Sequence, residues 1–326
     1  MLSRNDETVP TTRATRAAIA DPGAMTVSLL RGCTFAALVS CLGGIGCGGS
    51  DNAASDADAR RDAGGTAGDA GGARDAGNTN TAPRGKRGVA YGFQSAADLA
   101  ALGPSISWWY NWSDKPDFTA TSGAAFLPMV WDERFTTATL EAHVPAGAEY
   151  LLTFNEPNFV DQANMTPAEA AAKWPELQAF ARSRGMKLVS PAVNYCGSPC
   201  NDTDPFDWLQ KFLDACTGCQ VDYIAMHWYA CDKPAIVNTL ARYEQQFHKP
   251  LWVTELACLD DRSKVNDAAE LAYLKDAVAA LEADPMVFRY AWFTGRSTNS
   301  PPISLLGATG KLTALGAAYA AQPSAP

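Results

Sequence analysis

From residue 84 to residue 322 the sequence alternates short apolar runs with longer amphipathic stretches, and this alternation restricts the fold more than any other feature. Helical patterns lie between the apolar runs, for example at 167–184, preceded by Thr166 and followed by Gly185, and at 267–282. Eight runs have the length and composition of strands: residues 88–93, 105–109, 125–130, 150–155, 187–192, 222–229, 251–255 and 288–293.

Several of these runs are apolar on both faces, as expected of parallel strands that lie between a core and a layer of helices. Eight βα units in this segment average roughly 30 residues each, which is typical of a (β/α)8 barrel. An open doubly wound sheet is the main alternative, but the chain has no Gly-x-Gly-x-x-Gly or Walker-type loop after a strand. We therefore expect an α/β fold, a single (β/α)8 TIM barrel over residues 84–322.

The chain before this domain resembles an export signal followed by a tether. Residues 27–47 are apolar and carry no charge after Arg31, so residues 1–47 are interpreted as a signal segment, with Met25 as an alternative start. Cys41 and Cys47 are alternative lipidation sites. Residues 50–83 contain no Val, Ile, Leu, Met or aromatic residue, which predicts a disordered linker over 48–83. We expect an exported protein, secreted or lipid-anchored at the bacterial cell surface.

Charge and aromatic content limit the partners of the domain. The net charge of −9 argues against nucleic acid, because an acidic surface repels phosphates. Aromatic residues make up 10% of the chain, including 9 Trp, and flat apolar rings suit a ligand with flat apolar faces, such as a sugar. Packing in the core accounts for such rings equally well.

Two carboxylates stand at strand ends, where barrel enzymes place their reacting groups. Glu156 closes the fourth predicted strand in Asn155-Glu156-Pro157, and its place before proline predicts an extended backbone. Glu255 closes the seventh strand, so the two side chains are expected to face each other about 5 Å apart. Glycosidic cleavage needs such a pair: one carboxyl group protonates the leaving oxygen, and the other attacks the anomeric carbon or activates water. An ion pair or a cap is the structural alternative for either residue alone.

Five segments of the predicted domain form a recognisable set: Trp108-Trp109-Tyr110-Asn111-Trp112, Asn155-Glu156-Pro157-Asn158, Val221 to Tyr229 with its His-Trp-Tyr ending, Trp252-Val253-Thr254-Glu255 and Ala291-Trp292-Phe293. In these segments the sequence resembles glycoside hydrolase family 128 of clan A, and the resemblance covers essentially the whole predicted domain. It implies hydrolysis of β-1,3-glucan with retention of configuration, with Glu156 as acid/base and Glu255 as nucleophile.

The same resemblance implies further sugar-binding residues. Asn155 would bind the sugar 2-hydroxyl, Tyr229 would hold Glu255 ionised and oriented, and Trp292 would form the floor of the cleavage subsite. The other expected substrate contacts are His227, Trp109, Asn111 and Trp112. A turn-forming role for Asn155, and core packing for the aromatic residues and for His227, are the structural alternatives.

The cysteines favour disulfides over a metal. The chain has 3 His, too few for a His-rich ligand set, and no metal or other cofactor is expected. The predicted domain holds an even number of cysteines in an exported chain. Cys231 and Cys258 follow adjacent strands, so we expect them to pair and to brace the loops beside Glu255. The remaining four allow three pairings, of which the local ones, Cys196 with Cys200 and Cys216 with Cys219, are preferred.

Together these features and the resemblance imply a monomeric, retaining glycoside hydrolase that cleaves inside the glucan chain of β-1,3-glucan polysaccharides or oligosaccharides. A hydrolase of the same clan that cleaves another β-linked polysaccharide is one alternative. A surface protein that binds glucan without cleaving it is the other, and the presence of both carboxylates argues against it.

Overall fold

The computed structural model describes residues 85–117, 123–197, 199–260 and 265–324. The predicted signal segment, with Cys41 and Cys47, and the predicted linker therefore lie outside the described residues. The helices and strands, in chain order, are β1 (Arg87–Ala90), α1 (Ala96–Leu102), β2 (Trp108–Tyr110), β3 (Ala125–Phe126), β4 (Met129–Val130), α2 (Thr137–His143), β5 (Tyr150–Asn155), α3 (Pro167–Arg184), β6 (Lys187–Ala192), α4 (Pro205–Ala215), β7 (Ile224–Trp228), α5 (Lys233–Phe247), β8 (Leu251–Leu256), α6 (Asp267–Ala283), β9 (Val287–Trp292) and α7 (Ala314–Ala321).

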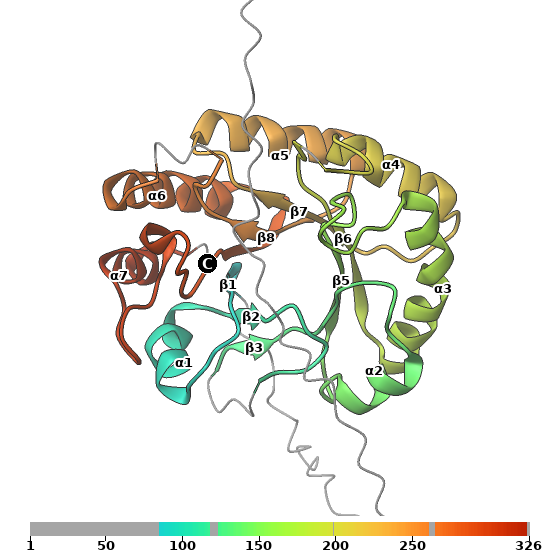
Figure 1. Ribbon diagram of the computed structural model, residues 1–326, viewed down its shortest axis with the longest axis horizontal. Coiled ribbons are helices and arrows are strands. Elements are labelled where there is room, and N and C mark those ends of the chain that lie inside the picture. Colours follow the sequence, from blue (N-terminus) through green and yellow to red (C-terminus); the bar gives the residue numbers. More distant parts are fainter. Residues whose placement is uncertain (1–84, 118–122, 198, 261–264, 325–326) are drawn as a thin grey trace, which may run out of the picture. The chain divides into compact units, whose positions relative to one another are not determined.

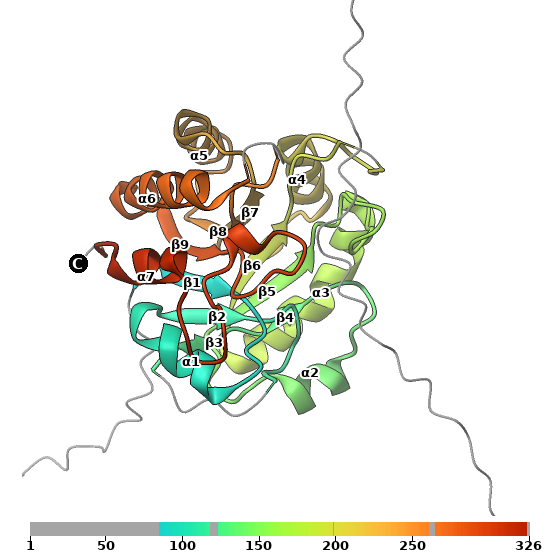
Figure 2. The same ribbon diagram turned by 60° about the vertical axis from the view of Figure 1, so that its left-hand side comes forward.

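The strands are parallel and form two sheets. One sheet has the order β3-β2-β1-β9-β8-β7 and the other the order β4-β5-β6. β4 follows β3 after two residues, and both occupy the single run predicted at 125–130. Bridges between Val189 and Tyr223 and between Val193 and Met226 connect the other edge, β6 to β7. The first and last strands, β1 and β9, pair directly and lie side by side (Figure 2). The predicted α/β class with parallel strands is confirmed.

The helices surround the strands (Figure 1), and the side chains of each strand divide between two apolar clusters. Because successive side chains point to opposite faces of a strand, neighbouring residues enter different clusters. The inner cluster, enclosed by the strands, contains Trp108, Tyr110 and Trp252. The outer cluster joins the strands to the helices and contains Trp109, Trp292 and helix residues such as Trp174. This division determines which strand residues can reach a site at the strand ends.

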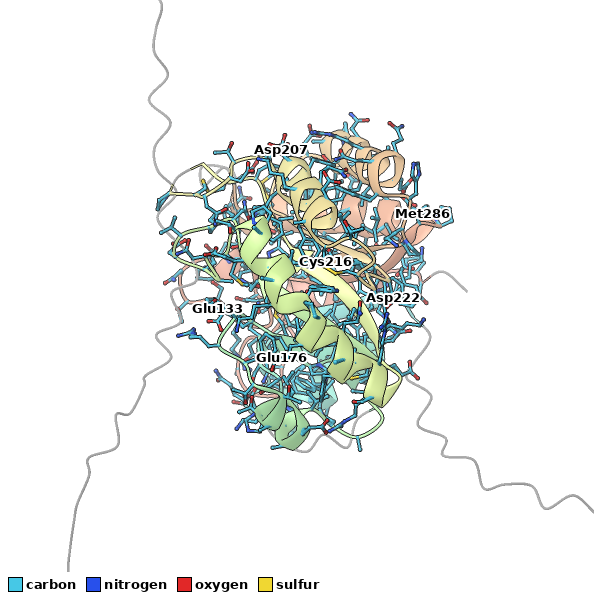
Figure 3. The ribbon with its side chains drawn as sticks, turned by 90° about the vertical axis from the view of Figure 1, so that its right-hand side faces the viewer. Glu133, Glu176, Asp207, Cys216, Asp222 and Met286 are labelled. Atoms are coloured by element: carbon cyan, nitrogen blue, oxygen red, sulfur yellow. A yellow bond between two sulfur atoms is a disulfide. The ribbon has the colours of Figure 1, made fainter. Side chains whose placement is uncertain are left out.

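Helix α3 shows why the sequence places the helices where they are. Its bounds match the prediction: the Thr166 side chain accepts a hydrogen bond from the Glu169 backbone, and Gly185 ends the helix at a φ of 69° that suits glycine. The buried side chains of α3 include Trp174, which packs against Phe212 of α4. On this side of the molecule α3 and α4 cover the strands and carry exposed acidic residues on their outer surfaces, among them Glu176 and Asp207 (Figure 3).

The three disulfides expected from the sequence are all present: Cys196–Cys200, Cys216–Cys219 and Cys231–Cys258. The last joins the segments that follow β7 and β8 across 27 residues of sequence. Among the described residues, no helix has both the length and the apolar character needed to cross a membrane.

Glu270 is a buried carboxyl group on the first turn of α6. It is fully inaccessible to solvent, one of its oxygens accepts a hydrogen bond from the backbone of Cys258 at 3.4 Å, and the other oxygen meets no partner within the described part of the chain. Burial raises the pKa of Glu270 from 4.5 to about 7. A carboxyl group in such a place is more stable when protonated.

This raised pKa makes folding stability depend on pH. Between about pH 4.5 and 7 the unfolded chain ionises Glu270 while the folded chain keeps it protonated, so stability should fall as pH rises through this window, by up to about 3 kcal/mol. Glu270→Gln keeps an acceptor for Cys258 and cannot ionise. We expect its melting temperature to fall less than that of the wild type between pH 5 and pH 8, by about 5 °C in calorimetry. Parallel melting profiles would contradict this assignment.

Candidate active site

Glu255 reaches the inner side of the strands because β8 contains an irregularity. Its neighbours on β8 alternate, with Trp252 in the inner cluster and Val253 in the outer one. If the side chains of β8 alternated strictly, Glu255 would point outward, as Val253 does, because residues two positions apart share a face of the strand. Between Val253 and Glu255 the pairing of β8 with β7 shifts by one residue, so that His227 lies opposite Glu255. Such bulges re-aim side chains, and this one turns the Glu255 carboxylate toward the inner side of the strands.

Three donors converge on the Glu255 carboxylate. Oε1 accepts hydrogen bonds from the Trp112 indole at 2.7 Å and the Tyr110 hydroxyl at 3.1 Å, and Oε2 accepts one from the Tyr229 hydroxyl. Burial, and then the charge of Glu255, raise the pKa of Tyr110 and of Tyr229 well above the usual value, so both stay protonated donors. This arrangement suits a negatively charged carboxylate held in one orientation.

Glu156 lies at the end of β5 in an unusual backbone conformation. Its φ of 40° is in the left-handed region, so the predicted extended backbone is wrong. The conformation is held by hydrogen bonds from the Glu156 backbone to the Ala192 carbonyl, at 2.8 Å, and from the Phe159 backbone to the Glu156 carbonyl, at 2.9 Å. The following proline strongly disfavours only the right-handed helical region for Glu156. The sharp turn at the end of the strand then requires the left-handed conformation in place of the extended one. A residue held in this way commonly belongs to a functional site.

The Glu156 carboxyl group is buried and in contact with polar neighbours. His227 Nδ1 lies 2.9 Å from its Oε1, and the Asn194 amide donates to the same oxygen at 3.4 Å. Burial raises the pKa of Glu156; the nearby His227 opposes this increase, and the charge of Glu255 adds to it. Glu156 therefore keeps its proton to a higher pH than an ordinary glutamic acid, as a general acid requires.

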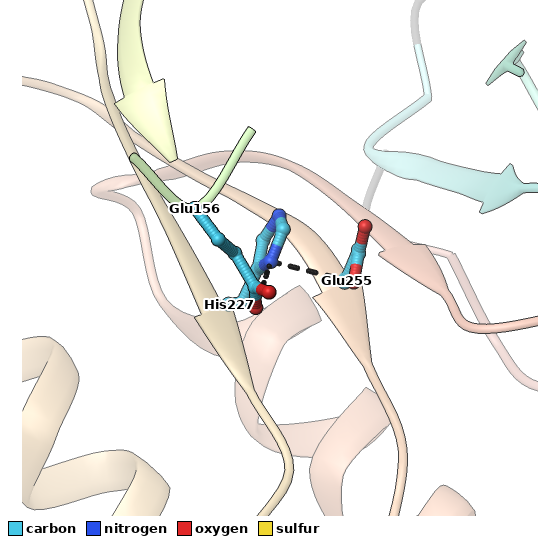
Figure 4. A group of neighbouring side chains, drawn as sticks. All are labelled: Glu156, His227 and Glu255. Atoms are coloured by element: carbon cyan, nitrogen blue, oxygen red, sulfur yellow. Dashed lines mark hydrogen bonds and ion pairs between the residues drawn. The ribbon is translucent and has the colours of Figure 1, made fainter. Parts of the chain in front are cut away.

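His227 lies between the two glutamates (Figure 4). Its Nδ1 is 3.3 Å from Glu255 Oε2, in addition to the contact with Glu156. Burial lowers the pKa of His227, but the charge of Glu255 and the hydrogen bond to Glu156 outweigh it and raise the pKa above the usual value. Each of the three side chains offers one atom that could bind a metal ion, and these three atoms lie within 4.8 Å of one another. Within the described ranges, this is the one set of His and acidic side chains grouped closely enough to hold a cation.

The structure brings several predicted residues together at this site. Trp112 and Tyr229 bond Glu255 directly, and His227 joins both glutamates. Asn155 is buried beside Glu156 and donates its amide to Gln162 at 3.0 Å. Asn111 instead closes a turn in its own loop, where its side chain bonds Ser113 and Lys115. Their roles in binding sugar remain predictions.

Two predicted sugar contacts are wrong. Trp109 and Trp292 are completely buried in the outer cluster, on the helix side of the strands. The Trp292 indole donates to the Ile303 carbonyl at 2.9 Å and its ring packs against Tyr273 and Tyr319 of the helices. Both residues are excluded from the site by strand alternation, since each stands one position away from an inward residue.

Three residues of the site were not predicted from the sequence. Tyr110, which lies one position from Trp109, bonds Glu255, and Asn194 bonds Glu156. Phe293, which follows Trp292, packs against the rings of Trp112 and Tyr229, at 5.9 Å and 5.6 Å between centroids. The period-two pattern of β2 and β9 could have identified Tyr110 and Phe293, because it separates each from its outward neighbour.

The chain is similar to known glycoside hydrolases. Residues 88–319 match a family model described as glycosyl hydrolase catalytic core. A structure of a family 128, subgroup II, endo-β-1,3-glucanase from Sorangium cellulosum is 44% identical, with a TM-score of 0.69, and covers 73% of this chain and 99% of its own. A subgroup I endo-β-1,3-glucanase from Amycolatopsis mediterranei, in complex with laminaritriose, is 33% identical, with a TM-score of 0.59, and covers 72% of this chain and 98% of its own.

A curated relative is also similar, the alkali-sensitive linkage protein 1 of Schizosaccharomyces pombe. It is 29% identical over 246 residues, which are 72% of this chain. The chain spans 44% of the length of that relative.

The role of His227 can be tested by titrating Glu156. His227→Leu removes the hydrogen bond and the charge that lower the pKa of Glu156, so we expect that pKa to rise. Carbon-13 NMR of protein labelled at the glutamate carboxyl carbons would follow the titration, and Glu156→Gln would identify the resonance by its disappearance. An unchanged or lower pKa in the His227 variant would show that the histidine does not act on Glu156.

Proposed function

Because the chain belongs to the glycosyl hydrolase catalytic core family, and within it to glycoside hydrolase family 128, we propose that it hydrolyses β-1,3-glucan with retention of configuration. The observation that carries the mechanism is the separation of Glu156 and Glu255, whose carboxylate oxygens approach within 4.8 Å. Retaining enzymes need a carboxyl separation of about 5 Å, whereas inverting enzymes need roughly 6.5–9.5 Å to admit a water molecule. The two glutamates are thus close enough for one of them to bond the sugar.

In the first step Glu255 attacks the anomeric carbon while Glu156 donates its proton to the departing glycosidic oxygen. The anomeric C–O bond breaks, a bond from Glu255 to the sugar forms, and Glu156 becomes a carboxylate. In the second step Glu156 takes a proton from water, which attacks the anomeric carbon and releases Glu255. The raised pKa of Glu156 supports the first role, and the three donors around Glu255 support its role as an oriented nucleophile.

Cleavage within the glucan chain is the favoured mode of action. The similar proteins from Sorangium cellulosum and Amycolatopsis mediterranei are both described as endo-acting β-1,3-glucanases. An endo-acting enzyme would release oligosaccharides of several lengths from laminarin early in the reaction.

The proposed activity is tested with laminarin and two variants. Glu255→Gln should lower kcat by roughly 10⁴-fold, because no other nucleophile can replace it. Glu156→Ala, assayed on an aryl β-laminaribioside whose activated phenol leaves without protonation, should regain activity with added azide, which needs no general base, and should form the β-glycosyl azide. The release of reducing ends measures the activity, and NMR of the anomeric form of early products shows whether the configuration is retained. Wild-type protein that binds laminarin without releasing reducing ends would instead be a glucan-binding protein, and near-normal hydrolysis by Glu255→Gln would refute the nucleophile.

We further propose that the domain is exported and acts as a monomer, with residues 1–83 serving as signal and tether. Three disulfides in the described part of the chain support an oxidising compartment. In a bacterial host, fractionation should place the protein outside the cytoplasm. Mass spectrometry of the mature N-terminus should find a lipid-modified Cys41 or Cys47, or an unmodified N-terminus if the protein is secreted. An unprocessed chain in the cytoplasm would contradict export.

A further inference from the structure

The segment that follows Glu156 folds back over the end of β5. The Ala163 backbone donates to the Asn155 carbonyl at 3.1 Å, and the Met165 backbone donates to the Pro157 carbonyl at 2.8 Å. This fold brings the side chain of Gln162 to Asn155, and Gln162 Oε1 accepts a hydrogen bond from Asn155 Nδ2 at 3.0 Å. A loop residue thus contacts the side chain that precedes the general acid.

The returning loop is fixed by side-chain amides. Asn201 donates to the carbonyls of Pro157 and Met165, at 2.8 Å and 3.2 Å. Asn158, which is completely buried, donates to the carbonyls of Asn194 and Asp202, at 2.8 Å and 3.2 Å. Each of these amides joins the loop to the segment after β6. Gln162 is therefore presented from a braced backbone rather than from a free loop.

The Asn155 amide has hydrogen-bonding capacity left over. An amide group offers two N–H donors and one carbonyl oxygen. Gln162 occupies one donor, and Asn155 Oδ1 is buried without a partner among the residues that the structure describes. This hydrogen bond fixes the rotation of the Asn155 amide and leaves one of its N–H donors for another ligand.

We propose that Gln162 is a positioning residue for the reaction: it orients the Asn155 amide toward the 2-hydroxyl of the sugar at the cleavage site. The inference rests on the proposed glucanase function and on the expected contact between Asn155 and that hydroxyl. Gln162 does not touch the sugar, and its contribution passes through Asn155 alone. Because hydrogen bonds to the 2-hydroxyl strengthen in the transition state, the effect falls on kcat rather than on KM.

The test compares two substrates that differ by one hydroxyl group: 4-nitrophenyl β-laminaritrioside and its analogue that lacks the 2-hydroxyl on the sugar bearing the aryl group. Gln162→Leu should lower kcat about 5- to 10-fold on the first substrate, as expected for one misdirected hydrogen bond, and by less than about 2-fold on the second. Gln162→Glu, which keeps an acceptor oxygen in place, should restore most of the loss. Asp161→Ala on the same loop is the matched control, because that exposed side chain makes no hydrogen bond to a described residue.

Failure of the positioning role of Gln162 and failure of the proposed glucanase function give different results. An equal loss on both substrates would make Gln162 only a support for the loop, and unchanged rates on both would remove it from the reaction, so either result overturns the inference. Loss of stability in Gln162→Leu does not confuse the comparison, since both substrates are measured with the same protein. Wild-type protein that fails to hydrolyse laminarin would overturn the proposed function and this inference with it.

Discussion

Two acidic side chains held close together in a buried site are the constraint on which the rest of this structure depends. Carboxylate oxygens of Glu156 and Glu255 lie within 4.8 Å, where two full negative charges would repel strongly. The two carboxyl groups have different surroundings, which favour the charged form of one and the protonated form of the other. Both are buried, but Glu255 receives three donors, whereas Glu156 has a raised pKa and shares His227 with its partner. This asymmetry, rather than the residue type, supports the proposed division of roles between proton donor and nucleophile.

Surrounding elements hold that asymmetry in place from several directions. β2 contributes Tyr110 and the loop after it contributes Trp112, while Tyr229 follows β7. The Cys231–Cys258 disulfide ties the segments after β7 and β8 together, and the Leu259 backbone donates to the Tyr229 carbonyl at 2.8 Å. Groups that touch one carboxylate thus come from parts of the chain that are distant in sequence. Their convergence explains why so much of the domain is required to place a few polar atoms.

Much of the fold and of the site could be predicted from the sequence, and the failures have two physical causes. Strands β5 and β6 and helix α3 have their predicted bounds, because apolar periodicity and the caps of α3 are local signals. Both glutamates were identified from their place at strand ends. Trp109 and Trp292 were assigned to the wrong face, since a strand exchanges its faces with a shift of one residue. Contacts such as those of Asn194 and Gln162 depend on how loops fold back, and no periodic pattern encodes that.

The irregularity in β8 has a consequence for relatives of this chain. Glu255 faces the inner side of the strands because the pairing of β8 with β7 shifts between Val253 and Glu255. A homologue that kept the Thr-Glu pair in a strand paired without this shift would direct its carboxylate at the helices. Such a protein would retain the sequence motif and would lack the proposed chemistry. In this fold, the pairing of a strand decides the role of its acidic residue as much as the identity of that residue does.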